Sequence, residues 1–423
     1  MLNLIPLFLL LAVFGVPLAY SIGIMVWIYF LQLDIPPIII VIRMAAQQIS
    51  YPLVAIPLFI CAANIMAKGG MTDRLIDWCV AALGWIRGGI AQVNILMSII
   101  FAGISGAALA DVASIGQWLI PAMEKRGYKA EYAAAVTVAS STVSPIIPPS
   151  ISLIVAGIIA ETSIVELFMA GILPGLLMGL FLMILAYFIA VKKKHPKEIQ
   201  SFSIKYFLEK TKVAILDLVL PILIIGGIRF GWYTATEGAA VALAYALFIT
   251  GLIYKVLTWG KIVDAVASTV KLSSAVIFMV SMSASLSYII TLERIPEKMV
   301  AFISSLGAPY WALILIIMGV LLTVGMVMDG LSALIIFLPV ILPLATLLHM
   351  PNLNHLIHFV HLSLVLGVLT PPVGVCLFLA SGISGVDILR IAKATLPFLI
   401  VLIFALLLVA FIPGLTTWLP SFI

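Results

Sequence analysis

The residues best suited to bind an ion lie in the segment SSTVSPIIPPSIS, residues 140–152, which interrupts a long apolar stretch. A proline inside a helix removes a backbone hydrogen bond and clashes with the preceding turn, so the three prolines here predict a broken helix. At bilayer depth, broken backbone occurs only where it is buried in protein or lines a cavity. Free carbonyls suit Na⁺, and the amino ends of half-helices suit an anion. The segment therefore predicts a binding site for a cation, an anion or both.

The same pattern recurs in the second half of the chain. The proline pair at 148–149 has a counterpart at 371–372, in the segment VLTPPVGV, 223 residues later. Other pairs at this offset, or one residue less, are Pro174 with Pro397, Gly103 with Gly325, and Pro121 with Pro343. Ordered matches of this kind are the weak internal symmetry expected of transporter repeats. We therefore expect two repeats, in residues 1–191 and 213–423.

Each half also contains a candidate re-entrant hairpin with a tip of small residues, at 101–116 and at 321–336. Hairpin tips and helix breaks together predict two matched Na⁺ sites near the middle of the membrane. For the first site the candidate ligands are Gly103, Ser105, Ser144, Ile147 and Pro148. For the second site they are Gly325, Asp329, Gly367, Thr370 and Pro371. The alternative is that these prolines and glycines only permit kinks and close helix packing.

Polar side chains at the tips and breaks are the candidates for contact with a substrate. They are Ser105, Ser150, Ser152, Asp329 and Thr370. No lysine or arginine lies at the expected depth of either break. The charge of an anionic substrate would therefore be met by half-helix amino ends, by hydroxyl groups and by bound Na⁺. This reasoning predicts that binding of an anion is coupled to binding of Na⁺.

Two further carboxylates lie in apolar segments and have more than one interpretation. Asp111, six residues after Ser105, is either a functional group or a partner within its own hairpin. For Glu237 we favour a structural role, in which Thr234 or Thr236 caps a helix with an acidic first turn.

Two motifs suggest other chemistry. GISG at 103–106 has the G-x-S-G pattern of serine hydrolases, with His361 as an imaginable base, but no carboxylate is placed to orient that histidine. An intramembrane serine hydrolase is therefore a remote alternative. His355, His358 and His361 have a spacing that metal sites favour on a helix. We expect these three histidines to lie at a solvated helix entry instead.

The composition places all of these segments in a membrane. The chain has 423 residues, of which 64% are hydrophobic and 9% are charged, with a mean hydropathy of +1.30. Soluble domains carry about 25% charged residues, so we expect an all-α polytopic membrane protein. Apolar runs long enough to span a bilayer extend over Ile5–Leu31, Ile164–Val191, Leu272–Leu292 and Ile391–Ile412. Cys61, Cys79 and Cys376 have no zinc or disulfide spacing and are expected to be small buried hydrophobes.

The polar segment KKKHPKEIQSFSIKYFLEKTK, residues 192–212, joins the two halves and contains seven lysines. The positive-inside rule makes this linker cytoplasmic. With five full spans and one re-entrant hairpin per half, both termini fall on the periplasmic side. An odd number of crossings per half also means that the second repeat is inverted relative to the first.

Five segments of the chain resemble a known family. They are RGGIAQVNILMSIIFAGISGAALADVASIG, AAAVTVASSTVSPIIPPSI, MAGILPGLLMG, TATEGAAVA and GVLTPPVGVCLFLASGISG. In these motifs, and essentially from end to end, the sequence is similar to the large membrane subunit, called M or DctM-like, of tripartite ATP-independent periplasmic (TRAP) transporters.

The resemblance implies Na⁺-coupled secondary active import of an organic acid, such as a C4-dicarboxylate or sialic acid, across the bacterial inner membrane. It implies two protein partners, a small four-helix membrane (Q) subunit and a periplasmic substrate-binding (P) protein, with no nucleic acid and no enzymatic activity. It also implies an elevator mechanism, in which a transport domain of about residues 90–160 and 309–382 moves against a scaffold formed by the remainder. The nearest alternative is a stand-alone Na⁺-coupled dicarboxylate or citrate-type symporter.

Four positions depart from the pattern usual in that family. Ala107 stands where a further hydroxyl residue is usual, and Ser144 stands where glycine is usual. Gly330 takes the place of a frequent proline, and His361 the place of a common asparagine. Because of these differences, the exact set of Na⁺ ligands and the number of Na⁺ ions do not follow from the resemblance.

Overall fold

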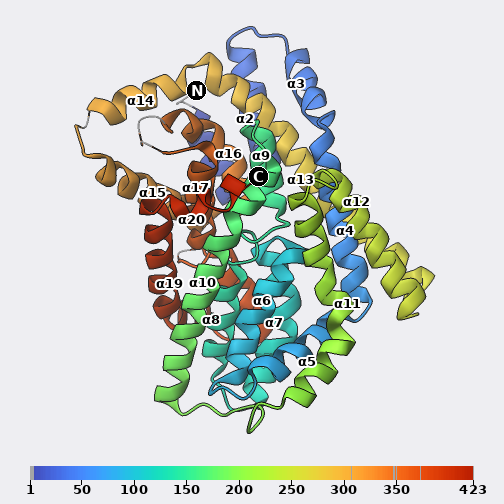
Figure 1. Ribbon diagram of the computed structural model, residues 1–423. Coiled ribbons are helices and arrows are strands. Elements are labelled where there is room, and N and C mark those ends of the chain that lie inside the picture. The colour runs from blue at the N-terminus through green and yellow to red at the C-terminus, as the bar shows by residue number, and fades with distance from the viewer. Residues whose placement is uncertain (1–3, 306, 346–347, 349, 372, 423) are drawn as a thin grey trace.

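The chain folds into helices throughout the part that the structure describes. The computed structural model describes residues 4–305, 307–345, 348, 350–371 and 373–422, without side-chain detail at residues 5, 9, 12, 13, 104 and 105. Seven helical segments in this part are long and apolar enough to cross a membrane. They are Tyr51–Lys68, Ile164–Lys193, Ile204–Arg229, Ala235–Ile253, Trp259–Leu292, Tyr310–Val327 and Ile388–Phe411. The expected all-α polytopic architecture is therefore confirmed (Figure 1).

Three of the four predicted apolar runs each lie within a single long helix, to within one residue at the end of the run. These helices are α10 (Ile164–Lys193), α13 (Trp259–Leu292) and α19 (Ile388–Phe411). α13 begins well before the run that predicted it, because its first turns carry charged and hydroxyl residues such as Lys261, Asp264 and Thr269, which lower the local hydrophobicity.

The prediction of one continuous span over Ile5–Leu31 is wrong. The run is divided into α1 (Ile5–Val13) and α2 (Leu18–Gln32). Gly15 between them has a φ of +79°, a left-handed conformation that ends a helix and that glycine adopts without strain. Pro17 follows at the N-cap of α2, and it has no backbone N–H with which to continue α1.

The first predicted hairpin and the first predicted break are both present. α6 (Gly89–Ser105) and α7 (Ala108–Lys125) pack against each other and are joined by a tip at residues 106–107. α8 (Ala130–Ser141) ends where the proline segment begins, and α9 (Ile151–Ile159) starts after it. The residues between α8 and α9 are not helical, as the prolines predict.

The second half contains the same order of elements. α15 (Tyr310–Val327) and α16 (Gly330–Ile341) are joined by a tip at residues 328–329. α17 (Leu353–Gly367) and α18 (Val375–Ser384) flank the second break. The described residues between α17 and α18 are again not helical.

These elements interlock across the two halves. α18 packs against α7 and α8, and α9 packs against α16. The long helices α10 and α19 contact each other and lie alongside this group (Figure 1). Each half-helix that follows a break therefore touches the hairpin of the other half, which brings both tips and both breaks together.

The remaining helices surround this group. α13 packs against α2, α3 (Ile38–Gln48) and α4 (Ala55–Lys68), and α4 also packs against α12 (Ala235–Phe248). α5 (Met71–Leu83) packs against α6 and against α11 (Ile204–Arg229). The short helices α14 and α20 extend over Ile295–Ser305 and Gly414–Thr417.

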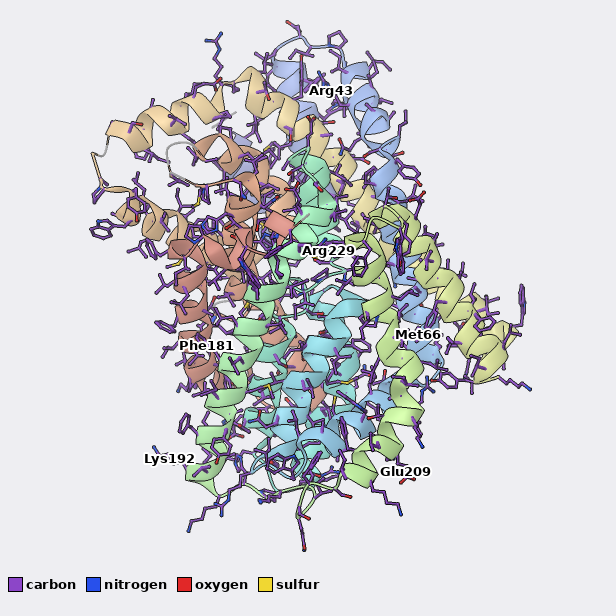
Figure 2. All side chains as sticks on the ribbon, viewed as in Figure 1. Arg43, Met66, Phe181, Lys192, Glu209 and Arg229 are labelled. Atoms are coloured by element: carbon purple, nitrogen blue, oxygen red, sulfur yellow. The ribbon has the colours of Figure 1, made fainter. Side chains whose placement is uncertain are left out.

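The basic linker is shorter than the polar segment that predicted it. α10 continues to Lys193, and α11 begins at Ile204, so only about half of residues 192–212 lies between the two helices. Figure 2 shows Lys192 and Glu209 at one end of the molecule and Arg43 at the other. The linker therefore marks one end of the bundle.

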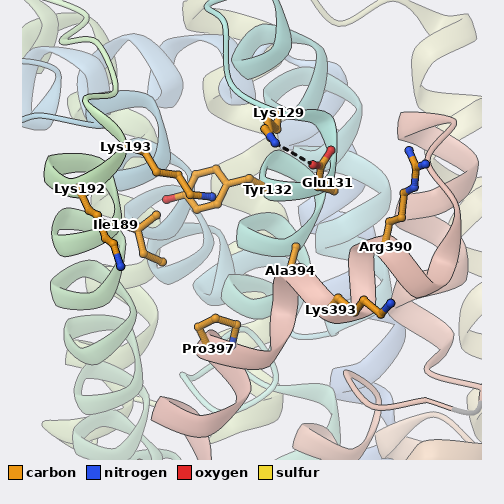
Figure 3. A pocket seen from close by; sticks show the side chains of 10 residues that line it. All are labelled: Lys129, Glu131, Tyr132, Ile189, Lys192, Lys193, Arg390, Lys393, Ala394 and Pro397. Carbon is orange, nitrogen blue, oxygen red and sulfur yellow. Dashed lines mark ion pairs between the residues drawn. The ribbon is translucent and has the colours of Figure 1, made fainter.

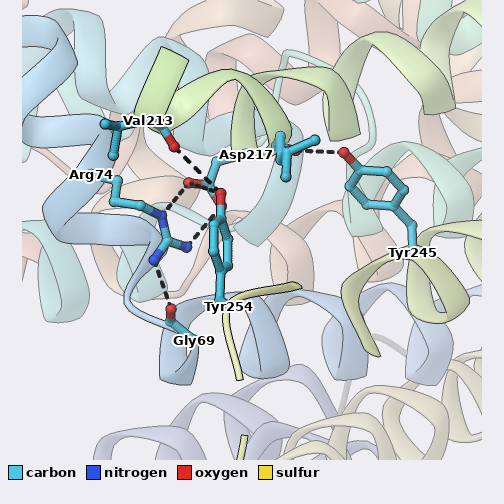
Figure 4. A network of polar contacts seen from close by, with 7 residues as sticks. Gly69, Arg74, Val213, Asp217, Tyr245 and Tyr254 are labelled. Atoms are coloured by element: carbon cyan, nitrogen blue, oxygen red, sulfur yellow. Dashed lines mark hydrogen bonds and ion pairs between the residues drawn. The ribbon is translucent and has the colours of Figure 1, made fainter. Parts of the chain in front are cut away.

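A buried ion pair joins α5 to α11 near this end (Figure 4). Arg74 donates through Nε to Asp217 Oδ2 at 2.6 Å and through Nη2 to Oδ1 at 2.9 Å. The Asp217 side chain has no solvent exposure, and the Arg74 side chain is 17% exposed. The Tyr254 hydroxyl donates to Asp217 Oδ2 at 3.4 Å, and the Arg74 guanidinium lies 3.8 Å from the centre of the Tyr254 ring. The two-pronged geometry satisfies a charge pair that is otherwise removed from water.

Candidate binding site between the two helix breaks

A small cavity lies where the two tips and the two breaks meet, and its volume is about 80 Å³. Side chains or backbone from five segments line it. They are Gly106, Ala107, Ala108 and Leu109 of the first tip, Pro145, Ile151 and Ser152 of the first break, Asp329, Gly330 and Leu331 of the second tip, Val365, Val368 and Cys376 of the second break, and Leu272 and Val276 of α13.

The first tip is in backbone contact with the first break. Gly106 has a φ of +59°, and a Cβ added there would lie 3.0 Å from the Pro149 carbonyl oxygen and 3.1 Å from the Ile151 nitrogen. Gly103 is one turn earlier, and its added Cβ would lie 2.9 Å from Pro221 Cβ and 3.7 Å from the Pro148 carbonyl oxygen. Small residues at the tip are therefore required for the hairpin to reach the break.

The second tip approaches the second break through two glycines. A Cβ added to Gly325 would lie 2.2 Å from the Leu364 carbonyl oxygen, and one added to Gly367 would lie 2.5 Å from Gly325 Cα. The Gly374 N–H also donates to the Met326 carbonyl oxygen at 3.0 Å. Gly325 and Gly367 lie inside or at the end of helices, so close packing accounts for both of them, and their role as ligands stays a prediction.

The two serines that follow the first break have different surroundings. Ser150 is the N-cap of α9, where its hydroxyl accepts from the Leu153 N–H at 3.3 Å and donates to the Pro145 carbonyl at 2.6 Å. Ser150 is fully buried and does not line the cavity. Ser152 does line the cavity, and its hydroxyl makes no hydrogen bond to the described part of the chain. Of this pair, Ser152 is therefore the one that is available to a ligand.

The Asp329 carboxylate both caps a helix and borders the cavity. Its carboxylate caps α16 by accepting from the Ser332 N–H at 3.0 Å and from the Ser332 hydroxyl, and Asp329 also lines the cavity. Asp111 occupies a related position in the first turn of α7 and is buried. Carboxylates at these helix amino ends are stabilised by the helix dipole.

The other predicted ligands lie around the cavity rather than on its wall. Ser144, Ile147 and Pro148 are buried in the first break. Thr370 donates to the Gly367 carbonyl at 2.6 Å, and Pro371 is exposed. The side chain of Ser105 is outside the described part of the chain. Among the predicted substrate-contacting residues, the structure places Ser152 and Asp329 together at the cavity.

Sequence reasoning missed most of the apolar wall. Pro145 and Ala107 belong to segments that the sequence singles out, but neither residue has a side-chain donor or acceptor. Leu272 and Val276 belong to α13, far from the repeated motifs, and nothing in their local sequence marks them as part of a site. Their spacing of four residues places both on one face of a helix, which any buried helix also shows.

The prediction that His355, His358 and His361 lie at a solvated helix entry is wrong. All three are buried, because α17 is enclosed by α10, α15, α16 and α19. His355 Nδ1 lies 2.7 Å from the Thr416 hydroxyl, and His358 Nδ1 lies 2.8 Å from the Asn354 carbonyl oxygen. Within the described ranges, no group of three His, Cys, Asp or Glu side chains is placed to hold a metal ion.

Two further structural predictions are confirmed. Thr234 and Glu237 form a capping box at the start of α12, in which each side chain accepts from the backbone N–H of the other. Cys79 and Cys376 are fully buried, and Cys61 is partly buried. Their thiols are not paired with each other.

The size and lining of the cavity limit what it can hold. A water molecule occupies about 30 Å³ and a pocket for a drug-sized ligand about 300–1,000 Å³, so this cavity has room for an ion or a few waters. Its described lining contains one carboxylate, Asp329, one free hydroxyl, Ser152, and neither lysine nor arginine. In this conformation the cavity therefore has room for a small ion or water molecules and none for an organic acid.

Comparison with known proteins gives one family over nearly the whole chain. Residues 5–415 match the family described as tripartite ATP-independent periplasmic transporter, DctM component. The C4-dicarboxylate TRAP transporter large permease protein DctM of Pseudomonas aeruginosa is 34% identical over 373 residues, which cover 88% of this chain and 87% of that protein. The sialic acid TRAP transporter large permease protein SiaM of Vibrio cholerae is 33% identical over 385 residues, 90% of each chain.

One relative is longer than this chain. The isethionate TRAP transporter permease protein DctMQ of Oleidesulfovibrio alaskensis is 35% identical over 408 residues, which are 96% of this chain but 64% of that protein. Among solved structures, the YdaH transporter of Alcanivorax borkumensis matches with a TM-score of 0.62 over 89% of this chain and 87% of that one. At 15% sequence identity, this match shows similarity of fold alone.

Proposed function

The chain belongs to the DctM component family of tripartite ATP-independent periplasmic transporters and is therefore a transporter subunit rather than an enzyme, and from this premise we propose that it is the large permease that imports an organic acid across the bacterial inner membrane. The relatives are named for C4-dicarboxylates, sialic acid, isethionate and 2,3-diketo-L-gulonate. All of these are anions at neutral pH. We extend to this chain only their shared class, a small organic anion.

The observation that carries the proposal is the cavity at which both tips and both breaks meet. It combines a carboxylate and a free hydroxyl with two half-helix ends. Among the described residues that line it, none is basic. A binding site of this kind can hold an anion only if bound cations balance the charge. This balance supports coupling to Na⁺.

We assign the Na⁺ ligands to the two breaks. Around the first break, the backbone or hydroxyl oxygens of Gly103, Ser105, Ser144, Ile147 and Pro148 supply ligands in the proposal. Around the second break, Gly325, Asp329, Gly367, Thr370 and Pro371 do so. The contact of Gly106 with the Pro149 carbonyl and that of Gly325 with the Leu364 carbonyl support this assignment, because they bring tip and break within reach of one ion.

The small volume of the cavity supports a moving transport domain. An organic acid needs more space than about 80 Å³, so the wall formed by Leu272 and Val276 of α13 must separate from the tips to admit it. In the proposal, residues 90–160 and 309–382 move as one transport domain, related by an inverted repeat, against a scaffold that includes α13. This is an elevator motion of the tips past α13.

The proposal includes two protein partners. The relative DctMQ carries additional length beyond the region that matches this chain, and its name joins M to Q. We therefore propose a small four-helix Q subunit bound to the scaffold and a periplasmic P protein that delivers the substrate.

Uptake into proteoliposomes tests the proposed function. The chain is reconstituted with its Q subunit, the P protein is added outside with a radiolabelled organic acid, and an inward Na⁺ gradient is imposed. We expect accumulation that requires both the gradient and the P protein. Full uptake without the P protein would instead support a stand-alone symporter, and uptake that is indifferent to the Na⁺ gradient would contradict the coupling.

Substitution of two neighbouring serines separates function from structure. Ser152→Ala is expected to raise the substrate or Na⁺ concentration for half-maximal uptake by roughly three- to ten-fold, as for loss of one hydrogen bond of about 1 kcal/mol. Its thermal unfolding is expected to be unchanged. Ser150→Ala removes the cap of α9 and is expected to lower the free energy of unfolding by about 1 kcal/mol. Reversed effects at the two positions would show that the cavity is not the site.

A further inference from the structure

A second and much larger cavity opens at the end of the molecule that carries the basic linker (Figure 3). Its volume is about 790 Å³, and it lies between the amino end of α8, the carboxyl end of α10 and the first turns of α19. Figure 3 shows Lys192 and Lys193 on α10 across from Arg390 and Lys393 on α19. The cavity is far larger than the one between the breaks and shares no lining residue with it.

The lining of this basic cavity is strongly cationic. It contains five basic side chains and a single carboxylate, Glu131, whose ion pair is with Lys129 at 3.9 Å. Four basic side chains make no ion pair with the described part of the chain, namely Lys192, Lys193, Arg390 and Lys393. Like charges gathered around one cavity repel each other unless an anion lies between them. The arrangement therefore favours an anionic ligand.

The position of the basic cavity identifies the kind of anion. The cavity lies at the polar end of α10 and α19, which contact each other and are both apolar enough to span a membrane. Ile189 of α10 and Pro397 of α19, one turn farther from this end than the basic residues, give part of its wall an apolar character. Farther along the same two helices, Phe181 of α10 and Phe404 of α19 continue the apolar surface, with 5.8 Å between their ring centres, and Phe404 is 54% exposed. A ligand that fits both parts has an anionic head and apolar tails.

We propose that the basic cavity binds the phosphate headgroup of an anionic phospholipid of the cytoplasmic leaflet, with its acyl chains along α10 and α19. Basic pockets between transmembrane helices on the cytoplasmic side recognise headgroups in this manner. The pairs on α10 and α19 face each other, so a headgroup with two phosphates, such as that of diphosphatidylglycerol, contacts both sides at once. Tyr132 lines the cavity between the two pairs, where its ring lies 5.4 Å from Lys193 Nζ.

The side chain of His195 lies next to the basic cavity. His195 follows the lysines of α10 and contacts the rings of Tyr128 and Tyr132, at 4.4 and 5.1 Å between ring centres. Burial, and then the nearby charge of Lys193, lower the pKa of His195 below its usual value. A lowered pKa means that His195 adds less positive charge beside the cavity than an ordinary histidine would at the same pH.

Lipid retention by the purified full-length chain tests the proposal. Two variants, Lys192→Gln with Lys193→Gln and Arg390→Gln with Lys393→Gln, are incubated with diphosphatidylglycerol in detergent, and bound lipid is measured by native mass spectrometry. We expect each variant to retain at least five-fold less lipid than the unchanged chain, roughly the effect of losing 1 kcal/mol of headgroup binding. The zwitterionic phosphatidylethanolamine should be retained weakly by all of them.

The matched control removes the same charge elsewhere at the same end. Lys205 and Lys212 are exposed in the first turns of α11 and do not line the cavity. Lys205→Gln with Lys212→Gln should leave retention unchanged, and an equal loss there would show only general attraction to a positive surface. Complete displacement of the lipid by millimolar inorganic phosphate would show a site for a soluble anion and overturn the proposal. The two variants are independent, so if one does not fold the other decides.

Discussion

Replacing Gly325 or Gly367 by alanine is expected to abolish uptake. An added Cβ at Gly325 would lie 2.2 Å from the Leu364 carbonyl oxygen, and one at Gly367 would lie 2.5 Å from both Gly325 Cα and the Leu322 carbonyl oxygen. Because the opposing atoms are backbone, no side-chain rotation relieves the contact, and α15 must separate from α17. Overpacking of this kind costs about 1–3 kcal/mol in stability. It also displaces the second tip from the second break.

The other glycine of α15, Gly319, provides the control. A Cβ added to Gly319 meets no atom within 4 Å. Gly319→Ala should therefore leave uptake and thermal unfolding unchanged, or stabilise α15 slightly, because alanine favours a helix more than glycine does. The measurements are initial rates in proteoliposomes and unfolding temperatures in detergent. Normal uptake by both Gly325→Ala and Gly367→Ala would mean that close approach of tip and break is not needed.

Loss of the buried carboxylate at Asp217 is expected to have the largest effect on stability. Asp217→Asn leaves the guanidinium of Arg74 without its charged partner in a site that is almost closed to water. Removing one member of a buried pair typically costs about 3–5 kcal/mol. We therefore expect a large fall in the unfolding temperature and weaker packing of α5 on α11, measured by thermal unfolding of the purified subunit.

The control for Asp217 lies on the same two helices. Lys210 Nζ and Asp77 Oδ2 also join α11 to α5 at 2.6 Å, but their side chains are 26% and 58% exposed. Asp77→Asn should cost less than about 1 kcal/mol, because water and salt screen an exposed pair. Combining Arg74→Met with Asp217→Leu should restore much of the stability, since burial of a pair of charges is then avoided. An equal effect of Asp77→Asn and Asp217→Asn would contradict this account.

Local chemistry explains which features could be predicted from the sequence. The helix breaks follow from proline, which acts on its own turn and the one before it. The capping box at Thr234 and Glu237 follows from side chains three residues apart. The division of the first apolar run into α1 and α2 is equally local, because it depends on Gly15 and Pro17. It was not predicted because the residues on both sides of the break are hydrophobic.

Burial of polar groups is where prediction failed. The spacing of His355, His358 and His361 is the same in a solvated helix and in one enclosed by neighbours. Only the packing of α10, α15, α16 and α19 around α17 determines that the three side chains are buried. The same applies to Ser150 and Ser152, because which hydroxyl caps α9 depends on the path of the backbone through the break.

The sequence by itself determined that this is a helical membrane protein with two similarly broken halves, since hydrophobicity and proline act within a few residues. The tertiary structure decided that α18 packs on α7 and that α9 packs on α16, which brings both tips, both breaks and α13 to one cavity. It also decided that lysines and an arginine from α10, α19 and the N-cap of α8 line a separate cavity. Both sites depend on contacts between residues that are distant in the chain, and side-chain spacing carries no information about such contacts.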